Sequence, residues 1–209
     1  MAMTESFPPL PAESNPYAPP QGKVEDAPTE AAPFYVVSAT KATLLMVFTF
    51  GLYSFYWFWR HWTMHKRTHK LDIWPVPRAI FSIFFAHSLN QEINHRLLRI
   101  RSPHHWSPGL WATVYVVSAI AGRILGRLPE SAISLATNVV LLVLVVGFEA
   151  LAVRQAQRAA NVSCGDPDAQ ANRRLTAVNY LWLLLGALFW GLTFLGVLAE
   201  MFFPDEVSA

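Results

Sequence analysis

Residues 175–199 read LTAVNYLWLLLGALFWGLTFLGVLA, a run of 25 residues without a single charged side chain. An α-helix rises ~1.5 Å per residue, so about 20 apolar residues are enough to cross the ~30 Å hydrocarbon core of a bilayer. This stretch therefore predicts a membrane-spanning helix, and an integral membrane protein is the class that we expect.

Three earlier stretches, 42–60, 108–128 and 131–150, are apolar enough to be further spans, and the last span is placed at 177–199. Residues 127–130 leave room only for a tight turn, so the second and third spans should form an antiparallel hairpin. We expect an all-α integral membrane protein with four transmembrane helices plus an amphipathic interfacial helix. The membrane domain should cover 34–203, with a short tail at 204–209.

The composition supports this class. Hydrophobic residues make up 53% of the 209 and charged residues only 14%, whereas soluble domains carry about 25% charged residues. The net charge of +2 gives no reason to expect a nucleic-acid partner, and one cysteine cannot form an internal disulfide. Residues 1–33 hold eight of the 15 prolines and five acidic side chains, which predicts a disordered tail.

Residues 79–89 are apolar but would cover only ~16 Å as a helix, about half of a bilayer. Extending the helix over 78–101 gives it apolar side chains at every fourth position and basic ones on the other faces. This pattern predicts a helix that lies in the membrane interface. A re-entrant segment and a fifth span remain as alternatives. The positions of the apolar stripe are Phe81, Phe85, Leu89, Ile93 and Leu97.

Lys and Arg accumulate on the cytoplasmic side of membrane proteins. With four spans, the loops 60–107 and 150–174 share one side and carry 12 of these residues, against four on the other side. Both termini are therefore predicted to face away from the cytoplasm.

His61, His65 and His69 are spaced four residues apart and would share one sector of a helix. Such a row could bind Zn²⁺, Ni²⁺ or Cu²⁺, or sense pH. The favoured interpretation is instead a basic face that contacts anionic lipid headgroups on the cytoplasmic side, and we expect no metal, cofactor or catalytic residue. The side chains expected to contact headgroups are Arg60, Lys66, Arg67, Lys70, Arg96, Arg99 and Arg101.

Arg123 and Glu149 are the ionisable residues that could enter the hydrocarbon, where charge is costly. Glu149 would lie ~27 Å along its helix from Ser131, so the two charges are predicted at opposite membrane faces rather than as a pair.

Two stretches of the chain resemble a known family. They are Phe34–Ser38 with Lys41, followed by Thr49-Phe50-Gly51-Leu52-Tyr53 and the aromatic run 56–59; Asp168, Asn172 and Val178-Asn179 are also similar, more weakly. The family comprises small bacterial inner-membrane proteins of unknown function. Its hallmark is a Thr-x-Gly-hydrophobic-Tyr element followed by a Tyr-Trp run. The resemblance implies a multi-pass protein of the bacterial inner membrane and no particular activity.

Three functions remain open at this point. The favoured one is a non-enzymatic scaffold or envelope-associated protein that binds the lipid bilayer and a protein partner or a second copy of itself. The alternatives are a small oligomeric transporter or channel, and a membrane enzyme acting on lipid through the histidines of 61–105.

Overall fold

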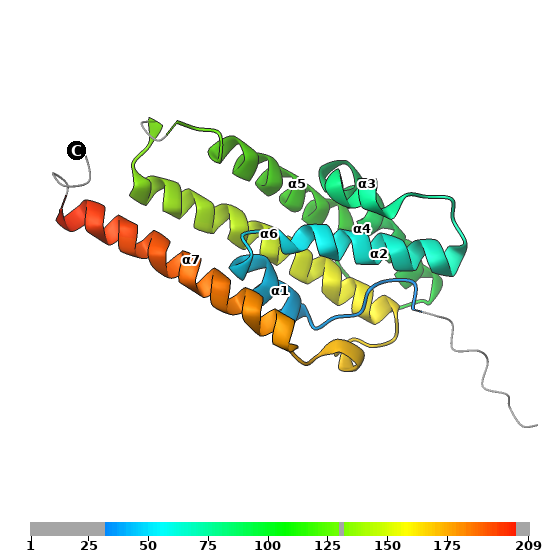
Figure 1. Cartoon of the computed structure of the whole chain (residues 1–209). Helices are drawn as coiled ribbons and strands as arrows, with labels where there is room; N and C mark the ends of the chain where they lie inside the picture. The colour runs from blue at the N-terminus through cyan, green and yellow to red at the C-terminus, as the bar shows by residue number, and fades with distance from the viewer. Residues whose placement is uncertain (1–31, 130–131, 204–209) are drawn as a thin grey trace, which may run out of the picture. The chain divides into compact units, whose positions relative to one another are not determined.

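The computed structural model describes residues 32–129 and 132–203, which are helical apart from the connecting turns (Figure 1). The predicted tails at 1–33 and 204–209 lie outside these residues, except for Ala32 and Pro33. The helices are α1 Ala39–Phe48, α2 Tyr53–His69, α3 Pro75–Ile80, α4 Ser82–Arg99, α5 Pro108–Leu125, α6 Leu135–Ser163 and α7 Ala177–Phe202, with a 3₁₀ turn, η2, at Gln170–Asn172.

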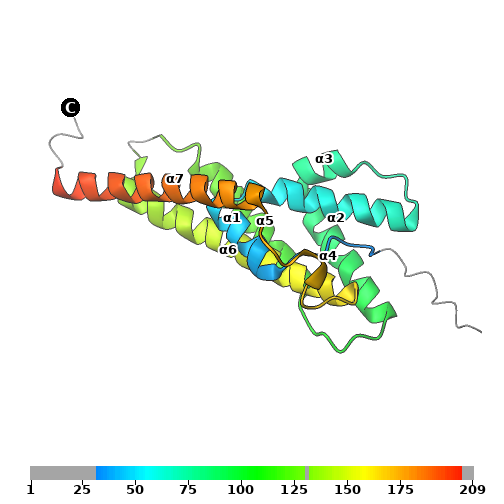
Figure 2. The ribbon, with the colours of Figure 1, turned by 60° about the horizontal axis from the view of Figure 1, so that its bottom comes forward.

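Three helices of the described part, α5, α6 and α7, are long and apolar enough to cross a membrane. They correspond to the predicted second, third and fourth spans and lie beside one another in both views (Figures 1 and 2). α5 and α6 form the expected antiparallel hairpin. α6 is longer than predicted, because 29 helical residues cover ~43 Å and its polar last turns therefore extend beyond a 30 Å hydrocarbon core.

The four-span arrangement is not confirmed, and the prediction of one helix over 42–60 is wrong. The chain turns between α1 and α2, where Phe50 and Gly51 have φ angles of 52° and 82°. This left-handed conformation suits glycine. Thr49 stabilises the turn, since its hydroxyl donates to the Leu45 carbonyl (2.6 Å) and accepts from the Tyr53 N–H (2.9 Å). An uncharged apolar run alone does not reveal such a break.

After this turn, α2 runs back past the residues that precede α1. The Phe34 ring stacks on His65 with centroids 5.4 Å apart, and the Tyr35 ring meets His61 edge-on at 6.0 Å. Residues separated by about 30 positions in sequence are thus in contact. We call α1, the turn and α2 the α1–α2 hairpin.

The tip of the hairpin packs on α7 at a glycine. A Cβ atom on Gly186 would lie 1.9 Å from the Phe48 carbonyl oxygen, so only glycine allows this approach. One turn further along α7, Trp190 donates its Nε1–H to the Val47 carbonyl (3.1 Å) and stacks on Phe50 at 4.7 Å. Gly186 is the one residue of α7 that is fully buried. The need for a glycine here is therefore explained within the chain, without a partner helix.

The predicted helix over 78–101 forms as α3 and α4, which meet at Phe81. Its apolar stripe does not face lipid as predicted: Leu89, Ile93 and Leu97 are at most 2% exposed, because α4 packs on α5 and α6. Polar contacts fix this position, among them Ser82 with the Tyr115 hydroxyl (2.9 Å). Only the first position of the stripe, Phe81, is exposed.

We predict that Gly186→Val separates the hairpin tip from α7 and lowers the free energy of unfolding by about 1–3 kcal/mol, the usual cost of overpacking. Gly191→Val is the matched control, because a Cβ there would meet no atom within 4 Å. Thermal unfolding in detergent measures both variants. Equal stability of the two would contradict the packing described for Gly186.

Candidate functional site

Two amide side chains in the last turns of α6, Gln157 and Asn161, are almost fully buried and hold the α1–α2 hairpin in place. Gln157 Nε2 donates to the Tyr35 carbonyl (2.8 Å) and to Asn161 Oδ1 (2.7 Å), while its Oε1 accepts from Trp57 Nε1 (2.6 Å). Asn161 Nδ2 donates to the Val37 carbonyl (3.0 Å). Buried polar groups are costly unless they are paired, so these bonds specify where the hairpin sits. We call them the Gln157–Asn161 network.

His61 is part of this network rather than of a metal site. Its Nε2 lies 3.3 Å from Gln157 Oε1, an acceptor, so Nε2 carries the proton. Burial lowers the pKa of His61 to about 3, opposed by the bond to Gln157 and assisted by the nearby Arg60 and His65 charges. At neutral pH His61 is therefore an uncharged structural residue.

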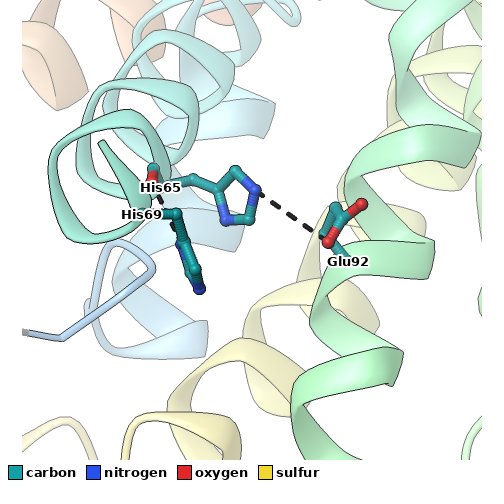
Figure 3. A network of polar contacts seen from close by, with 3 residues as sticks. All are labelled: His65, His69 and Glu92. Atoms are coloured by element: carbon teal, nitrogen blue, oxygen red, sulfur yellow. Dashed lines mark hydrogen bonds and ion pairs between the residues drawn. The ribbon is translucent and has the colours of Figure 1, made fainter. Parts of the chain in front are cut away.

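His65 and His69 come next along the same face (Figure 3). His65 Nε2 points at Glu92 Oε2 across 3.9 Å, and His69 Nδ1 lies 3.1 Å from the His65 carbonyl, to which it donates. Burial lowers the pKa of His65 to about 4, with His69 lowering it further and Glu92 raising it. His65 is thus neutral at pH 7 and forms no charged pair with Glu92.

The row of histidines does not assemble a metal site. His61 bonds to Gln157, His65 stacks on Phe34, and no three His, Cys, Asp or Glu side chains of the described residues form a group suited to a metal ion.

The basic residues assigned to headgroup contact differ in what surrounds them. Arg60 lies over the Tyr35 ring at 5.1 Å, and Lys66 donates to the Ile73 carbonyl at 2.8 Å. Arg96 is half-buried. The members with exposed side chains are Arg67, Lys70, Arg99 and Arg101.

Arg123 and Glu149 are closer to each other than predicted. α6 begins at Leu135 instead of residue 131, and Gly122 of α5 packs on Val145, one helical turn from Glu149. The Arg123 charge lies within electrostatic range of Glu149, although no ion pair within 4 Å joins them in the described part of the chain. The Glu149 carboxylate lies against the hairpin turn, with Oε2 2.6 Å from where a Cβ of Gly51 would stand.

A cavity of about 580 Å³ opens between the α1–α2 hairpin and the start of α7, and we call it the hairpin cavity. Its lining combines two cations, three tyrosines, several hydroxyl and amide groups, and an apolar portion. The lining residues are Tyr35, Lys41, Leu45, Thr49, Leu52, Tyr53, Tyr56, Arg60, Asn172, Thr176, Val178, Asn179 and Trp182.

Lys41 belongs to this cavity, although the sequence prediction treated it only as a loop charge on the outer side. It is only 6% exposed, and its Nζ donates to Asn172 Oδ1 (2.9 Å) and to the Arg174 carbonyl (2.8 Å). Asn172 in turn donates to the Tyr35 hydroxyl (2.9 Å). Burial lowers the pKa of Lys41. The available signal was the family resemblance, because Tyr35, Lys41 and Asn172 all belong to the residues that carry it.

No protein-family description, curated protein or solved structure matches the chain. The class of protein is therefore defined by the fold and the cavity alone. The described part of the chain is all-helical with three candidate membrane-spanning helices, and a cationic cavity lies beside the first turns of α7.

The low pKa of His61 predicts acid sensitivity. An unfolded chain protonates this histidine below its ordinary pKa of 6.5, whereas the folded chain does so only near pH 3. The His61 contribution to stability is therefore complete above pH 6.5 and is lost as the pH falls, at about 1.4 kcal/mol per pH unit.

We expect the unfolding temperature of the wild type to fall between pH 7.5 and pH 5, and His61→Gln to fall less. The exposed His95 provides the control variant, His95→Gln, which should behave like the wild type. The same pH dependence in His61→Gln and the wild type would count against a neutral, buried His61.

Proposed function

We propose that this chain is a non-enzymatic protein of the bacterial inner membrane with three spans. Its N-terminal side faces the cytoplasm and carries a helical platform of α2, α3 and α4 for interaction with anionic lipids and with a protein partner. The proposal keeps the scaffold role favoured by the sequence and includes membership of the family that the Thr-x-Gly-hydrophobic-Tyr element resembles. It changes the number of spans and the side of the N-terminus.

The distribution of charge carries this proposal. Fifteen of the 16 Lys and Arg residues lie in the described part of the chain, and only Arg123 and Arg127 lie near the connection from α5 to α6. The other thirteen lie toward the opposite end of the bundle. They are Lys41, Arg60, Lys66, Arg67, Lys70, Arg78, Arg96, Arg99, Arg101, Arg154, Arg158, Arg173 and Arg174.

With Lys23 counted on the N-terminal side, all 16 divide as fourteen against two, a stronger bias than the twelve against four of the four-span arrangement, and the richer side is expected in the cytoplasm. Three crossings also leave the proline-rich first 31 residues on the cytoplasmic side, so they need not be moved across the membrane. The C-terminus is then on the opposite side.

A non-catalytic role is supported by the contacts that the polar side chains make within the fold. The histidine row and the amides of α6 are bonded or stacked within the fold, and the described residues that line the hairpin cavity include no His, Cys, Asp or Glu. General acid–base chemistry needs such groups at the place of reaction. Exposed basic side chains on α2 and α4 instead suit contact with anionic headgroups.

The test is a pair of reporter fusions on the full chain. We expect green fluorescent protein to fluoresce when fused before Met1, and alkaline phosphatase to be active when fused after Ala209. A phosphatase inserted after Leu128 should also be active, since this connection would share the outer side. Active reporters of one kind at both termini would refute the three-span topology and restore an even number of crossings.

A further inference from the structure

We propose that the hairpin cavity binds the phosphate-bearing headgroup of an anionic phospholipid from the cytoplasmic leaflet, with Lys41 and Arg60 as the groups that hold it. The choice of leaflet rests on the topology proposed above. The binding itself is argued from the residues that line the cavity.

The cavity has positive charge without a matching anion. In the described residues, neither Lys41 nor Arg60 has a carboxylate within ion-pair distance. The acceptors of Lys41 are an amide and a backbone carbonyl, both neutral, and an ammonium group has three protons of which these use two. A buried cation is costly unless it is paired, so an anion beside Lys41 would gain a charge-assisted hydrogen bond.

Arg60 offers a second donor to the same space. Its guanidinium lies over the rings of Tyr35 and Trp59, 5.1 and 5.9 Å from their centroids, which fixes its position through contacts that use none of its N–H groups. Its Nε is buried and has no hydrogen-bond partner, and the Tyr53 hydroxyl of the cavity lining is in the same condition. Phosphate oxygens suit the planar fork of donors that arginine presents.

The rest of the cavity favours an amphiphile over a free ion. Leu52, Val178 and Trp182 form an apolar part of the lining and are themselves about half exposed or more. This surface continues onto α7, where Gly186 is the one buried residue and the other apolar side chains are at least partly exposed. Acyl chains could therefore follow α7 into the bilayer while the phosphate remains beside Lys41. Basic pockets between membrane helices on the cytoplasmic side bind lipid headgroups in this way.

The level of the cavity along α7 fits the same occupant. Thr176, the N-cap of α7, and Asn179 belong to the lining, so the cavity lies where the last span begins and where headgroups are found. The N-terminus of a long helix also carries a partial positive charge that favours an anion. Two other occupants are conceivable, inorganic phosphate and the acidic residues of the first 31 positions, and the experiment separates them.

Native mass spectrometry of the full chain in detergent, with added phosphatidylglycerol or phosphatidylcholine, measures the binding. We expect phosphatidylglycerol to be retained preferentially, and both Lys41→Met and Arg60→Gln to weaken its binding about tenfold, the loss expected for one charge-assisted hydrogen bond. Arg158→Gln removes the same charge from an exposed site on α6, outside the platform of α2, α3 and α4, and should bind like the wild type.

Arg60→Gln keeps the proposal testable if Lys41→Met unfolds, because the contacts given for Arg60 are with aromatic rings and none is a hydrogen bond to the backbone. Equal retention of the two lipids, or an equal loss in Arg158→Gln, would overturn the proposal. Displacement of phosphatidylglycerol by millimolar inorganic phosphate would contradict the proposal and assign the site to a free anion. If phosphatidylglycerol binds preferentially only after residues 1–31 are removed, the occupant in the full chain is instead the acidic N-terminal segment. Because binding in detergent is independent of orientation, the reporter fusions can fail while this result stands, and the converse also holds.

Discussion

The structure depends on the bonds that Gln157 and Asn161 make to the backbone of residues 35–37 and to Trp57. The two amides are one helical turn apart on α6, and between them they pair the Tyr35 and Val37 carbonyls, which would otherwise be buried without donors. This network keeps the segment before α1 against the end of α6. From this fixed start α1 runs along α6 and α7 for ten residues, about 15 Å, before the chain turns back.

The turn itself is built from the Thr-x-Gly-hydrophobic-Tyr element. Thr49 bonds to both α1 and α2, and Gly51 adopts the left-handed conformation with the Glu149 carboxylate against it. The tip then packs on Gly186, and the space left beside the start of α7 becomes the hairpin cavity. The elements of the family resemblance thus meet in one structural unit, because Asn172 joins Tyr35 to Lys41. This is why the cavity is the part of the molecule where we place a ligand.

The sequence predicts the parts of this fold that hydropathy determines. The long apolar runs correctly indicate α5, α6 and α7, and the short connection after α5 indicates the antiparallel pairing of α5 and α6. The prediction of one helix over 42–60 fails because two helices joined by a turn can be as apolar as one crossing helix, and a single glycine among aromatic residues does not distinguish the two cases. The separation of Arg123 from Glu149 fails because the register between helices depends on where α6 begins. Lys41 was missed as a site residue because its partners, Asn172 and Arg174, are more than 130 positions away.

In the proposed topology the chain enters and leaves the α1–α2 hairpin on the same side of the membrane, and this arrangement is central to the account. Double electron–electron resonance between spin labels at Val36 and His69, in a Cys164→Ser chain reconstituted in lipid nanodiscs, tests it. Since Phe34 and His65 stack at 5.4 Å, the labels should be about 25 Å apart or less, allowing ~3.5 Å per residue of extended chain. A span over 42–60 would separate them by more than the ~30 Å of the hydrocarbon core, and such a distance would contradict the hairpin.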